Sequence, residues 1–240
     1  MIKEKIGGEF LVKETDFKDV FITEEFDETS KQMLEATREF VEKEIYPHVR
    51  ELENHNYDLV ESIMKKAGQM GLLGLNIPEE YGGFGMGFNL SMLICGEMSC
   101  YSGSVATAYG AHTGIGTYPI LYYGSEEIKK RFLPRIASGE WLSCYNLTEP
   151  SAGSDANAGK TIAKLDNTAQ NYEITGQKIW ISNAGFSEVF IVFARIENDK
   201  NITGFVLEKS KSEGITLGEE EKKLGLNSSS TRQVFYNKVK

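Results

Sequence analysis

The chain is 240 residues long, which corresponds to one large domain or two modest ones and allows a sizeable core without disulfide or metal staples. Hydrophobic residues make up 40% of the sequence and charged residues 25%, values that exclude a disordered or collagen-like chain. The formal net charge of −9, without a basic stripe, argues against nucleic acid as a partner. No apolar run approaches the ~20 residues of a membrane-spanning helix, so we expect no transmembrane segment.

The first residues and the cysteines indicate a compartment. Residues 1–10 contain charges and a glycine pair but no apolar signal core, so we expect no export signal and a cytoplasmic protein. The three cysteines, Cys95, Cys100 and Cys144, form an odd count for a chain of this length. They are predicted to be buried thiols in a reducing compartment and not a disulfide framework.

The first 140 residues have the period of helices. Apolar residues recur at helical spacing over 33–45, which Pro47 ends, and over 59–70, where Gly71 stands at the position of a left-handed C-cap. A glycine-rich loop over 74–87 follows. The next two segments, 90–100 and 104–123, are predicted to be nearly all-round apolar helices.

A last helix of this half begins at Ser125, a good N-cap, and Pro134 is expected to end or kink it. After Trp141 the apolar period changes from about 3.6 to 2. The predicted strands are 141–147, 171–182, 188–196, 202–209 and 232–239. The acidic run 219–221 is interpreted as a solvated turn.

Helices followed by strands predict an α+β fold, with an N-terminal helical bundle before a mainly antiparallel β domain. The predicted division is an extension over 1–25, a helical domain over 26–140 and a β domain over 141–240. The final strand pattern has no closing turn, so we expect the chain to stop before its protein does.

Several common motifs are incomplete. Five residues separate Gly153 from Gly159 where a phosphate-binding P-loop has four, and the glycines of 82–87 lack the spacing of a dinucleotide fingerprint. No histidine or cysteine pair has metal-ligand spacing, so no metal site is predicted. His112 is interpreted as a hydrogen-bonded core residue, and Cys144 has no neighbouring base that would make it a nucleophile.

Residues 144–155 carry more information. A strand enters the corner Thr148-Glu149-Pro150, and small residues follow it. Pro150 fixes the exit angle, and Gly153 allows a ligand to approach the backbone closely. Two interpretations remain open at this point: a tight structural corner, or a site for a flat, polar ligand.

A second informative segment is 178–185, in which a strand presents Trp180 and then Ser182 before a turn. Residues two apart lie on the same face of a strand, so the indole can cover a planar ring while the hydroxyl binds its edge. A lone tryptophan in a strand is usually a core residue, and this alternative stays open for Trp180.

Together these two segments resemble the acyl-CoA dehydrogenase family. The similarity extends to several further stretches in the same order, namely 71–83, 123–127, 132–134, 138–140 and 223–239. Residues 110–116 and 204–208 resemble the very-long-chain branch. Members of the family bind FAD between a β domain and two helical domains.

The resemblance implies roles for individual residues. Thr148 would bind the pyrimidine side of the flavin, Trp180 would shield the ring, and Ser182 would bind near N5. Ser154 corresponds to a contact with the CoA part of the substrate. The complete set of implied cofactor-binding residues is Tyr145, Leu147, Thr148, Gly153, Ser154, Trp180, Ile181 and Ser182.

The implied reaction oxidises a fatty acyl-CoA thioester to trans-2-enoyl-CoA: a glutamate takes the Cα proton, and the Cβ hydride passes to flavin N5. In the family that glutamate lies in a C-terminal helical domain, and the resemblance implies that this domain is missing from the chain. We therefore assign no catalytic residue in this chain and reject Glu149 for the role. The family also implies an electron-transfer flavoprotein as acceptor and a homodimer or homotetramer. Alternative functions are an acyl-CoA oxidase or other flavoprotein on the same fold, or a non-catalytic acyl-CoA or flavin-binding module.

The apolar segment 90–123 also has two interpretations. In this family it provides plausible walls for a fatty-acyl tail, whereas ordinary packing in a helical bundle explains the same residues equally well.

Overall fold

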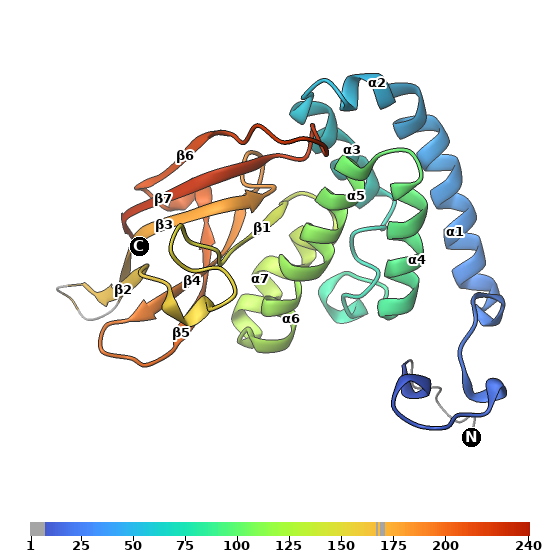
Figure 1. The fold of residues 1–240 in the computed structure, drawn as a ribbon, viewed down its shortest axis with the longest axis horizontal. Coiled ribbons are helices and arrows are strands. Elements are labelled where there is room, and N and C mark those ends of the chain that lie inside the picture. Colours follow the sequence, from blue (N-terminus) through green and yellow to red (C-terminus); the bar gives the residue numbers. More distant parts are fainter. Residues whose placement is uncertain (1–7, 167, 169–170) are drawn as a thin grey trace.

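The computed structural model describes residues 8–166, 168 and 171–240. A helical part and a strand part lie side by side along the long axis, with the described N-terminal residues at one end and the C-terminus at the other (Figure 1). Within the described residues, no helix is long and apolar enough to cross a membrane. They also contain no cluster of metal-ligating side chains.

The helical part packs its longer helices around one apolar core. This core includes Ile63 and Met64 of one helix, Ile94 and Met98 of another, and Tyr109 of a third, all of them buried. The helices are α1 (Glu28–Phe40), α2 (Val49–Leu52), α3 (Tyr57–Gln69), α4 (Phe88–Ser99), α5 (Gly103–Gly110), α6 (Tyr118–Tyr123) and α7 (Glu126–Ala137). Single π-helical turns follow α1 at Val41–Ile45 and α5 at Ala111–Ile115.

The strand part is a seven-stranded sheet in the order β1-β4-β2-β3-β7-β6, with β5 paired to β4. The strands are β1 (Ser143–Asn146), β2 (Ile162–Leu165), β3 (Tyr172–Ser182), β4 (Val189–Ile196), β5 (Ile202–Glu208), β6 (Ile215–Glu220) and β7 (Thr231–Val239). β4 pairs in parallel with β1 and with β2, and the other ladders are antiparallel. The predicted α+β class with a mainly antiparallel β domain is therefore confirmed.

A third apolar cluster joins the two parts. Leu133 and Ile136 of α7 pack with Val189 and Ile191 of β4, and all four side chains are almost fully buried. α6 and α7 consequently lie between the sheet and the rest of the helices (Figure 1). This packing places the end of α5 and its π-helical turn beside β1.

The predicted helix over 104–123 is wrong in its middle. α5 ends at Gly110, the π-helical turn follows, and α6 starts only at Tyr118. The amide of Gly116 donates to Ala111 O at 2.8 Å, a five-residue spacing that widens the helix, and Pro119 then begins the next one.

Two further predictions about the helical part are wrong in part. The helix does not end at Pro134: α7 continues to Ala137, because Pro134 lies on the exposed side while Leu133 and Ile136 hold the last turn in the core. The alternative, a kink at Pro134, stays a prediction. Of the three cysteines only Cys144 is buried; Cys95 is half-buried, and Cys100 is exposed at the end of α4. The predicted left-handed C-cap is confirmed, because Gly71 has a φ of 80°.

The strand predictions over 171–182, 188–196, 202–209 and 232–239 agree with β3, β4, β5 and β7 to within a residue or two. The short strands β2 and β6 were not predicted. The solvated turn expected at 219–221 is wrong, since Glu220 ends β6 and accepts hydrogen bonds from Arg232 Nε at 2.6 Å and from Ser230 Oγ at 2.7 Å. A guanidinium partner explains why this carboxylate is tolerated in a strand.

His112 is a fully buried histidine that ties the π-helical turn to both neighbours. Its Nδ1 accepts the backbone N–H of Ser143 at 3.1 Å, and its Nε2 donates to Ile136 O at 3.1 Å. A donor at one nitrogen and an acceptor at the other fix the neutral tautomer. Burial lowers the pKa of His112 to about 4, although the hydrogen bond to Ile136 opposes this shift.

This buried histidine predicts a loss of stability in acid. Its pKa lies below the unfolded value of 6.5, so the stabilising contribution is complete above pH 6.5 and declines as the pH falls toward 4. We expect the free energy of unfolding to fall by about 2 kcal/mol from this group between pH 7 and pH 5. Chemical denaturation at several pH values measures this dependence.

The variant His112→Gln should be less stable at pH 7 and should lose that part of the pH dependence. Equal slopes for His112→Gln and the wild type would contradict the assignment.

Candidate functional site

The corner that follows β1 is a tight loop closed by its own backbone. The amide of Glu149 donates to Ala152 O at 3.0 Å, and the amide of Ala152 returns a bond to Glu149 O at 3.1 Å. Pro150 and Ser151 form the tip of the loop, where Pro150 has no N–H to satisfy. The corner therefore holds Thr148 in a fixed position at the end of β1.

Trp180 lies in an irregular stretch of β3. The pairing with β7 shifts register between Lys178 and Ile181, and Trp180 has a φ of 58°. A bulky side chain in this left-handed region is a steric outlier that costs roughly 1–2 kcal/mol. The bulge leaves the indole 63% exposed, so the prediction of a ring available to a ligand fits the structure better than the core alternative.

The corner and the bulge form two sides of one small pocket. A hydrogen bond from the amide of Ile179 to Thr148 O, 2.9 Å long, joins the two segments. The pocket has a volume of about 140 Å³. Its lining residues are Ala111, Ile115, Tyr145, Leu147, Thr148, Trp180, Ile181 and Ser182.

The pocket lining brings together most of the residues singled out from the sequence. Thr148 and Ser182 are half-buried, and their hydroxyls have no hydrogen bond within the described ranges. Gly153 and Ser154 are exposed and lie outside the lining. Open space surrounds the position that a Cβ on Gly153 would occupy, so this backbone is accessible to a ligand.

Sequence reasoning missed the third side of the pocket. Ala111 and Ile115 reach it from the π-helical turn, and Ile115 is half exposed there. The surrounding stretch 110–116 was noted for its family resemblance and, as part of 90–123, as a wall for a fatty-acyl tail, but not as a neighbour of Thr148 and Trp180. A helix that widens by one residue has no periodic signal that could have identified these two side chains.

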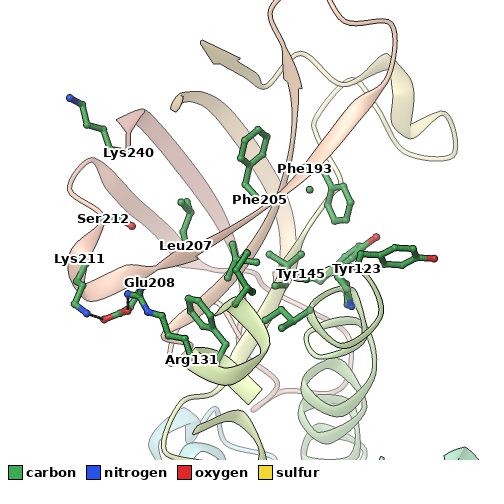
Figure 2. Close-up of a pocket in the computed structure, with 18 of the residues that line it drawn as sticks. Tyr123, Arg131, Tyr145, Phe193, Phe205, Leu207, Glu208, Lys211, Ser212 and Lys240 are labelled. Carbon is green, nitrogen blue, oxygen red and sulfur yellow. Dashed lines mark hydrogen bonds and ion pairs between the residues drawn. The ribbon is translucent and has the colours of Figure 1, made fainter. Parts of the chain in front are cut away.

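A larger groove of about 870 Å³, which shares Tyr145 with the small pocket, lies between α6, α7 and the strands β4 and β5 (Figure 2). Its floor is apolar, with Ile191, Phe193 and Val206 among the lining residues. The Tyr145 and Phe193 rings lie 4.9 Å apart between centroids. No sequence motif indicated this groove, because α6 and β5 are distant in the sequence.

One end of the groove carries a compact charge cluster. Figure 2 shows the Glu208 carboxylate between Arg131 and Lys211, with which it forms ion pairs; the one to Lys211 is 2.8 Å long. Burial raises the pKa of Glu208, but the hydrogen bonds from Lys211 and Arg131 outweigh that effect and lower it overall. The negative charge of Glu208 is therefore matched within the cluster.

Comparisons with known proteins identify the family of this chain. Residues 27–140 match the domain described as "Acyl-CoA dehydrogenase, N-terminal domain", and residues 144–239 match "Acyl-CoA dehydrogenase, middle domain". The chain belongs to the acyl-CoA dehydrogenase family. It is 42% identical over 97% of its length to a probable acyl-CoA dehydrogenase of Bacillus subtilis, but it spans only 39% of that relative.

Solved structures of the family have the same fold. An acyl-CoA dehydrogenase complexed with FAD from Bacillus anthracis superimposes with a TM-score of 0.91 at 41% identity, covering 97% of this chain and 40% of the other. Butyryl-CoA dehydrogenase from Megasphaera elsdenii has a TM-score of 0.81 at 31% identity, covering 89% and 57%. The predicted family is confirmed, and the chain is partial relative to these homologues.

The strained backbone of Trp180 predicts that its side chain contributes little to folding. Asparagine tolerates the left-handed region, so Trp180→Asn should leave the ligand-free free energy of unfolding unchanged or raise it by up to about 1 kcal/mol. The neighbouring Ile181 is buried, and Ile181→Asn should cost about 3 kcal/mol. Denaturant titrations test both; a loss above 2 kcal/mol for Trp180→Asn would contradict the interpretation.

Proposed function

We propose that the complete protein containing this chain is an FAD-dependent dehydrogenase that oxidises a fatty acyl-CoA to trans-2-enoyl-CoA. The observation that carries the proposal is the small pocket where Thr148, Ser182 and the exposed Trp180 meet. The proposed division of the chain is an extension over 1–25, a helical domain over 26–140 and a β domain over 141–240.

The residues present fit one edge of a flavin ring. Two half-buried hydroxyls that have no partner among the described residues supply hydrogen bonds to a polar edge, and an exposed indole supplies a flat surface for stacking. A pocket of about 140 Å³ is too small for a whole dinucleotide, so it would hold only the part of the ring near these groups. The remainder would lie along the open side, beside the accessible backbone of Gly153.

Each residue then has a distinct role. Thr148 binds the pyrimidine side of the ring, Ser182 binds near N5, and Trp180 covers the ring and excludes water from it. Ser154 contacts the CoA part of the substrate. Tyr145, Leu147 and Ile181 complete the walls, with Gly153 beside them. FAD, when bound, supplies the acceptor for the Cβ hydride.

No side chain of this chain is assigned as the catalytic base. Glu149 is buried, and both of its carboxylate oxygens accept hydrogen bonds from protein groups, so it is not available to take the Cα proton. The proposal places the base in a part of the complete protein outside these 240 residues.

The same proposal includes the substrate class, the electron acceptor, the oligomeric state and the location. We propose a long-chain acyl substrate, an electron-transfer flavoprotein as acceptor, a homodimer or homotetramer, and a cytoplasmic location. The apolar segment 90–123 and the resemblance of 110–116 to the very-long-chain branch support the long-chain preference.

An anaerobic titration of the complete protein tests the reaction. Palmitoyl-CoA should bleach the visible flavin absorbance and yield enoyl-CoA, because the substrate's two electrons pass to the flavin. Butyryl-CoA is the matched probe for chain length and should bleach it less completely. A flavin band unmoved by acyl-CoAs of any length would contradict the substrate, and absence of a flavin band would contradict the cofactor. If air is then admitted and hydrogen peroxide forms in an amount equal to the enoyl-CoA, the protein is an oxidase instead.

A larger side chain in the small pocket should weaken FAD binding without a large effect on the stability of the flavin-free protein. Ala111→Leu adds methyl groups to the pocket wall, so we expect FAD to bind at least about tenfold more weakly while the stability of the flavin-free protein changes by less than about 1 kcal/mol. Ala36→Leu in α1 is the control, since it makes the same change on a helix that does not line the pocket. Equal FAD affinity in both variants would place the flavin elsewhere.

A further inference from the structure

A buried ion pair joins the two segments that form the small pocket. Lys178 and Glu149 are 2% and 5% exposed, and Lys178 Nζ lies 2.7 Å from Glu149 Oε1. The same ammonium group donates to Leu147 O at 3.0 Å. One side chain of β3 therefore binds the corner at two points, on either side of Thr148.

The carboxylate of Glu149 extends this connection to a third segment. It accepts the backbone N–H of Lys160 at 2.5 Å and that of Thr161 at 3.1 Å, just before β2 begins. Burial raises the pKa of Glu149, yet the hydrogen bonds from Lys178, Thr161 and Lys160 outweigh this effect and hold the pKa below its ordinary value. The group is thus a carboxylate at neutral pH, and its buried charge is matched.

The sequence positions of the pair relate it to the site. Glu149 immediately follows Thr148, and Lys178 stands two residues before Trp180. Between the two side chains, the amide of Ile179 donates to Thr148 O at 2.9 Å. The ladder between β3 and β7 shifts register between Lys178 and Ile181, so Ile179 and Trp180 have no partner of their own in β7.

We propose that Lys178 and Glu149 are positioning residues, which set the spacing between the Thr148 corner and the Trp180 bulge and thereby hold both segments ready for the flavin. This inference rests on the proposed function for its consequence in flavin binding. The spacing itself is a property of the chain and can be measured without a flavin.

Physical reasoning favours this role over a purely stabilising one. A buried ion pair gains little net stability, because desolvation of both charges offsets their attraction. Apolar packing is non-directional and tolerates small displacements, whereas charge-assisted hydrogen bonds fix donor and acceptor within a narrow range of distance and angle. A site that needs two segments at a fixed separation therefore benefits from charge-assisted hydrogen bonds.

The test compares Lys178→Met with Ile174→Ala in the complete protein. Lys178→Met keeps the length of the side chain and removes the ammonium group. Ile174 lies in the same strand and is 1% exposed, so Ile174→Ala is a control that lowers stability without touching the pair. Glu149→Gln, which removes the other charge with almost no change in shape, serves as a second variant if Lys178→Met does not fold.

Three measurements separate position from stability. In flavin-free protein, hydrogen exchange at the Ile179 amide should be at least about tenfold faster in Lys178→Met than in Ile174→Ala. FAD should bind at least about tenfold more weakly, and the Trp180 fluorescence should lose part of its quenching by bound flavin. Ile174→Ala should lower the melting temperature yet keep the wild-type FAD affinity and quenching.

Wild-type values of Ile179 exchange and FAD affinity in Lys178→Met or Glu149→Gln would overturn the proposal. So would an equal loss of FAD affinity in Ile174→Ala, which would indicate a general effect of stability. If the wild-type protein binds no FAD, the proposed function fails, whereas the exchange of Ile179 still decides whether the pair sets the spacing.

Discussion

The contact that the rest of the structure depends on is the one between His112 and its two neighbours. This imidazole accepts a hydrogen bond from Ser143 at the start of β1 and donates one to Ile136 in α7. It therefore connects the helical part to the sheet within a completely buried environment. The π-helical turn that carries it presents Ala111 and Ile115 to the pocket, opposite Thr148 and Trp180. Together with the apolar cluster shared by α7 and β4, this connection fixes the walls contributed by helix and sheet relative to each other.

Two kinds of buried polar interaction support the pocket, and they differ in their response to pH. His112 is neutral, because burial lowers its pKa, so acid destabilises the connection by protonating it. The Lys178–Glu149 pair is charged, and the lowered pKa of Glu149 preserves the carboxylate under the same mild acid. The joint between helix and sheet is accordingly more sensitive to mild acid than the corner of the pocket.

Much of the fold follows from apolar period alone, because long elements repeat their pattern several times. β3 and β4 were predicted for this reason, as was α3 with its cap at Gly71. β2 has four residues, too few for a period to be evident, and β6 ends in the glutamates that were interpreted as a turn. Such a strand exists because Arg232 neutralises Glu220, a partner twelve residues away that a local pattern does not reveal.

The candidate site was likewise predicted only in part. Thr148, Trp180 and Ser182 were found because short motifs surround them, and the structure places all three in one pocket. Lys178 stood within one of those motifs, yet its role depends on Glu149, which is 29 residues away in the sequence. The groove beyond Tyr145 was missed for a related reason, since it exists only after α6 and β5 come together. A local sequence pattern can identify the side chains that line a candidate site. The residues that hold those side chains in place are determined by tertiary contacts, which a local pattern does not reveal.

The backbone at the end of β3 contains two residues with positive φ that are held there for different reasons. Trp180 and Asn183 both have positive φ values, 58° and 65°. Asparagine suits this region, and Asn183 Nδ2 also donates to Ala108 O at 2.9 Å, so its conformation agrees with local preference. Tryptophan does not suit it, and its ring gains little burial in return. The conformation persists because the residues on either side are held, Ile179 by Thr148 O and Ile181 by its pairing with Arg232. The conformation of Trp180 is thus imposed by its neighbours while its own side chain stays exposed beside a pocket, an arrangement that fits the proposed contact with a ligand better than a role in the fold.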